Sequence, residues 1–386
     1  MRVLISCLQS LRRHPIPAYD FWRRYFTKGC EEAGMEFVEI PGVDWAEALI
    51  YPAGKELDEW RTRTWEMVLA FVRREHNRQP LDFFLTYLYP QQVEVTAIIE
   101  LQRLGIPCVN FFCDNVREFH RVPKEYYPFA LHWVPEFEAL PMYRSANLPH
   151  LHAPMPCWVS PKLRDVVASE TEDPTFIGSA DILRRDLLGR ALQIGAHFIV
   201  RGPGWALETN RTTSGLSNSR SVSRTITNQL ALIRSHGLLS LLYKMESRLH
   251  PMHPPRVPAS KFRDAVFGDE YIRVTREATV TIGINRVPTP RTSNYRPIAY
   301  SRLRDLEAPM LGACYLTEWT AGLEEMYELG TEIETYRNAE ELSAKLMDLT
   351  KNHERRINMR KRAQRRSLHD HSVARSLGRI SAQLGL

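Results

Sequence analysis

Short apolar runs alternate with amphipathic stretches along most of the chain. The apolar run Arg2–Ser6 is followed by a polar loop, a helical pattern over Tyr19–Glu32 and a second run at Glu36–Ile40. Further on, Pro107–Phe112 is apolar except for Asn110 and is soon followed by Asp114. This order of strand, loop, helix and strand predicts a Rossmann-type α/β domain. A stretch rich in proline and histidine predicts that this domain ends near residue 160.

A second α/β series begins at Thr175. Thr175–Ile177 has the pattern of a strand, Gly178 and Ser179 that of a tight turn, and Ile182–Leu192 that of a helix. Between 206 and 263 the pattern changes: a polar stretch predicts a mobile or disordered loop, and Asn228–Leu249 predicts one or two amphipathic helices. We therefore expect a first domain over 1–160 and a second over 161–365, with an insertion at about 206–263. A C-terminal helix over 366–386 is expected to pack back on the first domain.

The stretch Ser301–Tyr336 has the order helix, strand, loop, helix, strand. Its first helix has apolar residues three and four positions apart, and Gly312 is suited to end it. Ala313–Thr317 is then a short apolar strand, followed directly by Glu318. Because ligands of α/β sheets bind at the carboxyl ends of the strands, this unit is a candidate binding element.

The composition is that of a globular chain, with 44% hydrophobic and 25% charged residues. No apolar run is long enough to cross a membrane, and the first residues lack the pattern of a secretory signal. The six cysteines are scattered without zinc spacing, which favours reduced thiols and a cytoplasmic location. No histidine pair has a third ligand at a recognised spacing, so no metal site is predicted.

Positive charge is concentrated near the C-terminus. The net charge is +6, and residues 351–366 hold eight basic residues against one acid, Glu354. Such a helix permits an anionic partner, either nucleic acid or an acidic membrane surface. A solvated helix face is the other interpretation.

Two groups of residues are candidates for binding an anionic ligand. Gly178 lets the backbone approach a ligand, Ser179 can cap the next helix, and Arg184 or Arg185 can pair with a phosphate; an ordinary turn between strand and helix is the alternative. Arg304 and Glu307 lie one helical turn apart and can contact a phosphate and sugar hydroxyls. A surface ion pair between the two is the alternative.

The run R-x-x-E-A-x-x-x-G-A-x-x-L-T-E, from Arg304 to Glu318, resembles the C-terminal half of GT-B glycosyltransferases of group 1. The spore-maturation CgeB-type branch is the most similar. The likeness covers most of the chain outside about 206–263. It includes Phe176-Ile177-Gly178-Ser179, Gly202-x-Gly204-Trp205, Ile282-x-Ile284-Asn285, Cys113-Asp114-Asn115 and His371-Ser372-Val373-x-Arg375.

The resemblance implies the α/β GT-B fold, in which two Rossmann-like domains face each other across a nucleotide-sugar cleft, with no obligatory metal or cofactor. The second domain would hold the donor. Gly178, Ser179 and Arg184 would lie near its diphosphate, Arg304 and Glu307 would contact its ribose, phosphate or sugar, and Asn285 belongs to the same donor-binding set. One departure is that the position eight before Glu307, where relatives have a second glutamate, is Ala299.

The implied reaction is attack by an acceptor hydroxyl on the anomeric carbon, with the nucleoside diphosphate leaving. The acceptor could be a glycan, a lipid-linked molecule, a protein or a modified nucleic acid, and the donor sugar a hexose or a pentose. An inverting enzyme needs a base, for which the candidates are Asp114, His14 and His120. We expect the enzyme in the cytoplasm, with peripheral contact at the inner membrane surface through Asn228–Leu249 as one option.

Two other functions are consistent with the sequence. One is a non-catalytic protein that binds nucleic acid or another polyanion through the basic helix 351–366, although that helix lacks interleaved aromatic residues. The other is a nucleotide-sugar epimerase of the same fold. The donor base, the acceptor and the oligomeric state are left open.

Overall fold

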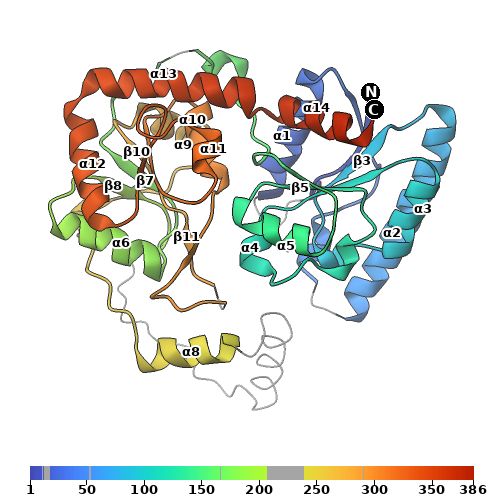
Figure 1. The fold of residues 1–386 in the computed structure, drawn as a ribbon, viewed down its shortest axis with the longest axis horizontal. Coiled ribbons are helices and arrows are strands. Elements are labelled where there is room, and N and C mark those ends of the chain that lie inside the picture. Colours follow the sequence, from blue (N-terminus) through green and yellow to red (C-terminus); the bar gives the residue numbers. More distant parts are fainter. Residues whose placement is uncertain (11, 13–17, 52–53, 166, 207–238, 290) are drawn as a thin grey trace. The chain divides into compact units, whose positions relative to one another are not determined.

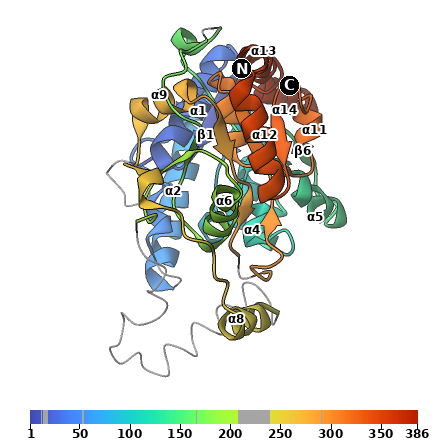
Figure 2. The same cartoon turned by 90° about the vertical axis from the view of Figure 1, so that its left-hand side faces the viewer.

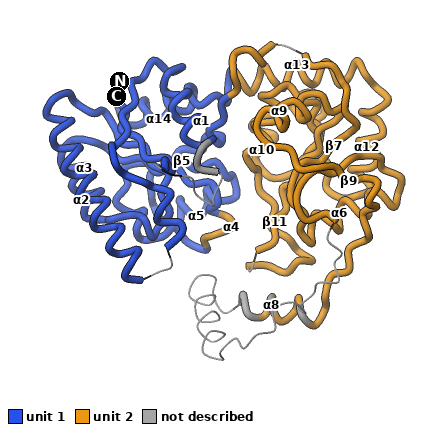
Figure 3. Tube along the Cα trace, turned by 180° about the vertical axis from the view of Figure 1, so that it is seen from behind, with its two compact units in different colours: residues 1–115, 120–158, 369–386 blue, residues 116–119, 159–368 orange. Residues whose placement is uncertain are grey.

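The computed structural model describes residues 1–386 except 11, 13–17, 52–53, 166, 207–238 and 290 (Figure 1). It divides into two compact units (Figure 3). Unit 1 comprises 1–115, 120–158 and 369–386, and unit 2 comprises 116–119 and 159–368. His14 and the polar stretch at 209–224 lie outside the described residues, as do residues 228–238 of the predicted amphipathic region.

Unit 1 is built on a six-stranded parallel sheet of order β2-β1-β3-β4-β5-β6. Residues of β1, β3, β4 and β5 are buried on both faces, as expected of strands between two helical layers. The strands are β1 (Arg2–Ser6), β2 (Glu36–Glu39), β3 (Phe83–Thr86), β4 (Cys108–Phe111), β5 (Leu131–Val134) and β6 (His150–His152). The helices are α1 (Ala18–Glu32), α2 (Lys55–Arg78), α3 (Val95–Arg103), α4 (Asn115–Glu118, mostly assigned to unit 2) and α5 (Leu140–Ser145).

Helix α14 (Val373–Leu384) returns the end of the chain to unit 1. It packs on α1, where Gly29 provides the space: a Cβ there would lie 2.2 Å from Cγ1 of Val373. Ser372 caps the start of α14 by accepting a hydrogen bond from the backbone N–H of Arg375.

Unit 2 contains a second six-stranded parallel sheet, of order β14-β13-β10-β7-β8-β9. A two-stranded antiparallel hairpin, β11 with β12, extends from it. The strands are β7 (Thr175–Ile177), β8 (Ile199–Arg201), β9 (Phe262–Arg263), β10 (Thr281–Gly283), β11 (Arg286–Val287), β12 (Ile298–Ala299), β13 (Tyr315–Glu318) and β14 (Glu334–Tyr336). The helices are α6 (Ile182–Gln193), α8 (Leu239–Leu249), α9 (Gly268–Glu277), α10 (Leu303–Met310), α11 (Leu323–Met326), α12 (Ala339–Lys351) and α13 (His353–Asp370).

The α/β order of both series is confirmed, and the helix–strand order predicted over Ser301–Tyr336 is present as α10, β13, α11 and β14. Of the described helices, none is long and apolar enough to cross a membrane.

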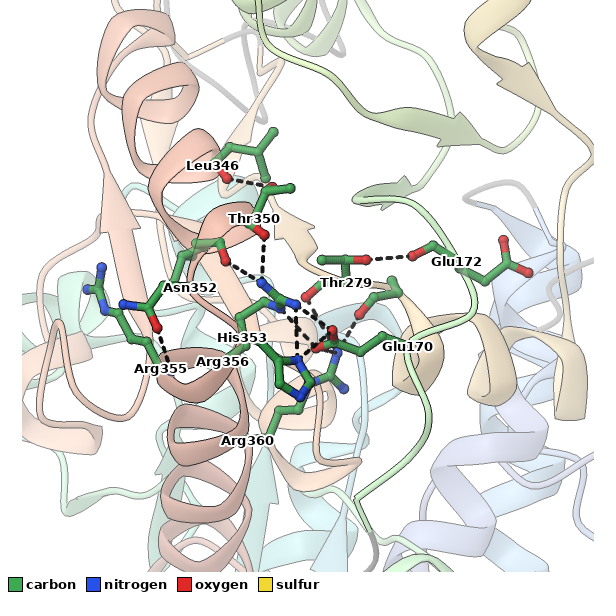
Figure 4. Close-up of polar contacts among 12 residues, drawn as sticks. Glu170, Glu172, Thr279, Leu346, Thr350, Asn352, His353, Arg355, Arg356 and Arg360 are labelled. Carbon is green, nitrogen blue, oxygen red and sulfur yellow. Dashed lines mark hydrogen bonds and ion pairs between the residues drawn. The ribbon is translucent and has the colours of Figure 1, made fainter.

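The basic helix α13 faces partly inward. Arg356 and Arg360 are 6% and 1% exposed, and both pair with Glu170, which lies in the segment before β7 (Figure 4). Glu170 accepts hydrogen bonds from Nε and Nη2 of Arg356 at 2.9 and 2.6 Å. Arg360 also donates to the backbone carbonyls of Arg276 and Ala278. The prediction of a solvated cationic face is therefore wrong for these two arginines, which join α13 to the sheet.

Candidate functional site

The candidate site lies at the carboxyl ends of β7, β10 and β13 in unit 2. The sheet order places β10 between the other two strands. The segments that follow these ends begin with Gly178, Ile284 and Trp319 respectively. Because parallel strands all end at the same edge, residues far apart in the sequence meet here.

The turn after β7 packs tightly against the turn after β8. Gly202 has φ of 145°, and a Cβ at this position would lie 2.2 Å from the carbonyl oxygen of Gly178. The indole N–H of Trp205 donates to the same carbonyl at 2.8 Å. Glycine is therefore required at 202 for the two turns to approach, which holds the Gly178 turn in place.

Asp181, and not Ser179 as predicted, caps helix α6. Its Oδ1 accepts from the backbone N–H groups of Leu183 and Arg184, both at 2.9 Å. Ser179 is exposed, and its carbonyl accepts from Nη1 of Arg184 at 2.9 Å. The helix begins at Ile182, as predicted, but its cap is the Asp181 carboxylate, which lies in extended backbone and reaches two N–H groups.

Arg184 belongs to a group of cations. Its guanidinium lies over the ring of Phe176, 5.7 Å from the centroid. Burial lowers the pKa of Arg184, Asp181 opposes this, and the positive charges of Arg302 and Arg304 lower it further. Such an arrangement favours an anion beside the Gly178 turn.

Arg304 and Glu307 both contact Tyr271 of helix α9. The guanidinium of Arg304 lies over the ring of Tyr271, 4.9 Å from its centroid, and the hydroxyl of Tyr271 donates to Oε2 of Glu307 at 2.5 Å. Within the described part of the chain, Nη1 of Arg304 is buried and has no hydrogen-bond partner. Both residues are thus organised by α9, rather than forming the simple surface pair that was the alternative.

Asp305, which the sequence analysis did not select, is the centre of a buried hydrogen-bond network. It is 0% exposed. Oδ1 accepts from the hydroxyls of Tyr315 and Thr317, each at 2.8 Å, and Oδ2 accepts from the side chain of Asn285 at 2.8 Å and the backbone N–H of Arg302 at 3.1 Å. Asp305 therefore fixes the start of α10 on strand β13, between Arg304 and the sheet.

Asn285 points into this network. It is 1% exposed, and its amide group donates to Asp305 and to the carbonyl of Glu318, both at 2.8 Å. Oε2 of Glu318 accepts from the backbone N–H groups of Asn285 and Arg286 at 3.1 and 3.0 Å. Oε1 pairs with the Arg286 guanidinium at 2.6 Å, so that the carboxylate raises the pKa of that side chain against the effect of burial. Asn285 and Glu318 consequently shape the segment after β10.

The proposed bases lie in the other unit. Asp114 is partly buried in the turn between β4 and α4, and His120 is exposed beyond α4. Both belong to unit 1. The structure thus places Asp114 at the carboxyl end of a strand, as predicted, while its role and that of His120 stay predictions.

The described residues contain no group of three or more His, Cys, Asp or Glu side chains arranged to hold a metal ion. All six cysteines are described and buried, and none of them forms a disulfide. Sequence reasoning missed Tyr271 and Asp305, because each is an ordinary polar residue in the first turn or two of a helix and its partners become apparent only in the fold.

Residues 184–382, just over half of the chain, match a family model described as glycosyl transferase-like. A sucrose-phosphate synthase from Thermosynechococcus elongatus has a similar structure, with 13% identity and a TM-score of 0.57 over 99% of this chain and 98% of its own. The Anabaena protein HepE in complex with UDP and glucose is 12% identical, with a TM-score of 0.52 over 100% of this chain and 99% of its own. AviGT4, a glycosyltransferase involved in avilamycin A biosynthesis, is 12% identical, with a TM-score of 0.53 over 99% of this chain and 96% of its own.

Among curated proteins, none matches the sequence. The structural likenesses confirm the predicted fold class, two Rossmann-like domains of the GT-B type.

Proposed function

The chain belongs to the glycosyl transferase-like family, and we propose that this glycosyltransferase moves a sugar from a nucleoside-diphosphate sugar to an acceptor hydroxyl. The observation that supports this donor class is the group of cations beside the Gly178 turn. Burial lowers the pKa of Arg184, the positive charges of Arg302 and Arg304 lower it further, and a diphosphate would relieve that repulsion. The complex of HepE with UDP and glucose is consistent with a uridine nucleotide as the first donor to test.

In this proposal Arg304 and Glu307 contact the donor from α10. The hydroxyl of Tyr271 holds the Glu307 carboxylate, and its ring supports Arg304, so that a carboxylate and a cation are presented side by side. A carboxylate accepts hydrogen bonds from sugar or ribose hydroxyls, while the guanidinium donates to a phosphate. Asp305 and Asn285 act through this pair by fixing α10, and they are positioning residues.

We also propose that transfer requires no divalent metal, because the three arginines can stabilise the charge that develops on the leaving diphosphate. For an inverting reaction, Asp114 is the first candidate for the base, since it follows a strand end as catalytic groups of α/β domains commonly do. His120 is the second candidate. Membership of the CgeB-type branch and a cytoplasmic location belong to the same proposal.

The test is a thermal-shift screen with UDP, GDP, dTDP and ADP, followed by hydrolysis assays with the corresponding sugars in the presence of EDTA. A nucleotide at about 100 times its Kd should stabilise the protein by roughly 2.7 kcal/mol. Arg304→Ala and Glu307→Gln should abolish that shift. The matched controls Arg190→Ala and Glu340→Gln, at exposed positions on α6 and α12, should keep it. A protein that responds to none of the nucleotides would contradict the proposal.

A further inference from the structure

Helix α8 carries three large apolar side chains that are more than half exposed. Leu242, Met245 and Leu249 are 58%, 55% and 71% exposed. Their spacings of three and four residues place them on one face of the helix. One exposed leucine is ordinary in a globular protein, but three in line on one short helix indicate a surface that meets an apolar phase.

Tyr295 is a further exposed aromatic residue, next to the end of α8. It lies in the connection between β11 and β12, is 54% exposed, and donates from its hydroxyl to the carbonyl of His250 at 3.3 Å, just beyond the end of α8. Two views show α8 at the margin of unit 2, apart from its sheet (Figures 1 and 2). A tyrosine combines an apolar ring with a polar end, which suits the boundary between water and lipid.

The sequence around the helix is strongly basic. Residues 239–263 contain a single acidic residue, Glu246, and five basic ones: Lys244, Arg248, Arg256, Lys261 and Arg263. His250 and His253 are exposed in the same stretch. A partner for this surface must therefore combine an apolar phase with negative charge.

The size of the face distinguishes between partners. Helix α8 has 11 residues. At 1.5 Å per residue it is roughly 16 Å long, and a stripe about 10 Å wide then covers only ~160 Å². A stable protein–protein interface needs about 800 Å² from each partner. Peripheral binding to a bilayer needs much less, because a few inserted side chains act together with the attraction of anionic headgroups.

We propose that α8 and Tyr295 form a membrane-binding surface that lies on a bilayer containing anionic phospholipid. Leu242, Met245 and Leu249 insert at the boundary between headgroups and acyl chains, and the net positive charge of residues 239–263 attracts the anionic headgroups. This surface is separate from the proposed donor site and requires no nucleotide. Its consequence for function is that the enzyme works on acceptors at a membrane surface.

The test is sedimentation of the full-length protein with vesicles, without nucleotide. The wild type should bind vesicles of phosphatidylcholine with phosphatidylglycerol at least about tenfold more tightly than vesicles of phosphatidylcholine alone. Raising the salt above about 0.1 M should weaken the binding, since it shortens the range of the attraction. The variant Leu242→Ser/Met245→Ser/Leu249→Ser should lose at least about tenfold in affinity.

The control variant, Ile194→Ser/Met347→Ser, removes two large apolar side chains that are each 48% exposed elsewhere on unit 2. It should bind vesicles like the wild type, and circular dichroism should show that both variants are folded. Equal binding by the triple variant and the wild type, or no binding by the wild type, overturns the proposal. The proposal is also overturned if the wild type is dimeric in solution and binds no vesicles while the triple variant is monomeric, because the apolar face then binds a second copy of the chain.

Discussion

Replacing Asp305 by asparagine tests whether one carboxylate fixes α10 to the second sheet. The wild-type side chain accepts four hydrogen bonds, two on each oxygen, at 2.8 to 3.1 Å. Asparagine can keep its oxygen toward the N–H groups of Asn285 and Arg302 and turn its N–H₂ group toward the hydroxyls of Tyr315 and Thr317, which then accept. The four hydrogen bonds lose the carboxylate charge, and a bond to a charged group is worth about 1.5–3 kcal/mol against about 0.5–1.5 kcal/mol for a neutral one. Asp305→Asn should therefore lower the free energy of unfolding by roughly 1–4 kcal/mol.

The measurement is urea unfolding followed by tryptophan fluorescence, together with hydrogen exchange of the backbone amides of β10 and β13. Exchange identifies the unit that is destabilised, which matters because a chain of two units need not unfold in a single step. The matched control is Asp269→Asn, which changes an exposed carboxylate in the first turn of α9. It should alter stability by less than about 0.5 kcal/mol. If Asp305→Asn behaves like this control, the hydrogen-bond network does not hold the element in place.

Three further variants test other parts of the fold. Glu170→Gln should destabilise unit 2 by about 3–5 kcal/mol in urea unfolding, because it leaves Arg356 buried without its carboxylate. Burial raises the pKa of Glu170, but the arginines outweigh this and hold the pKa below its ordinary 4.5. The wild type should therefore lose this stability as the pH falls below 4.5 and Glu170 takes up a proton, whereas the variant should not. Gly202→Ala should lower the unfolding midpoint and weaken the nucleotide-induced thermal shift, since its Cβ would press on the carbonyl of Gly178 at 2.2 Å. His132 is buried in β5, and burial lowers its pKa from 6.5 to about 3. Between these two pH values only the unfolded chain binds the proton, so the free energy of unfolding should rise with pH across this window. The variant His132→Leu should lack this contribution to the pH dependence.

Each of these variants has a control at an exposed site. Glu340→Gln lies in the first turn of α12 and should change stability by less than about 0.5 kcal/mol. Gly378→Ala has open space around its Cβ inside α14 and should be neutral or stabilising by up to about 1 kcal/mol. His253→Leu changes an exposed imidazole and should leave the pH dependence of unfolding unaltered. If Gly202→Ala is as stable as Gly378→Ala, the close approach of the two turns is wrongly assigned. If Glu170→Gln or His132→Leu keeps the pH dependence of the wild type, the ionisation assigned to that residue is wrong.

The elements that could be predicted are those with a local signal. Thr175–Ile177 has the predicted bounds and α6 begins at Ile182 as predicted, because an apolar run between turns and a helical period are properties of neighbouring residues. The N-cap of α6 was predicted wrongly, since Ser179 and Asp181 are equally suitable by type. The backbone decides between them: Asp181 is extended, with φ of −141°, directly before the first helical residue.

The candidate site could be predicted only in part, because its contacts depend on the fold and not on neighbouring residues alone. Arg304 and Glu307 were selected because a motif contains them, whereas Asp305 between them was not, although it makes more hydrogen bonds to the sheet. Its role depends on Tyr315, Thr317 and Asn285, which lie 10 to 20 positions away and become neighbours only when β10 and β13 pair. A sequence pattern cannot show such a network, because no spacing of residue types is specific for it.

The inward face of α13 bears on the choice between functions. A protein that binds polyanions through this helix would need its cations at the surface, where each can release a counterion. Arg356 and Arg360 are instead buried on Glu170 and on backbone carbonyls, and Arg355 pairs with Glu334 at 2.6 Å. Cations committed in this way cannot also neutralise phosphates without breaking the contacts that join α13 to the sheet. The described cations that remain without a carboxylate partner of this kind include Arg304 at the candidate donor site, where Nη1 is left unpaired beside Tyr271. Lys361, Arg362 and Arg365 are exposed on α13, so a polyanion would have to bind through these remaining cations, whereas Arg304 is available to a small anionic ligand at the strand ends.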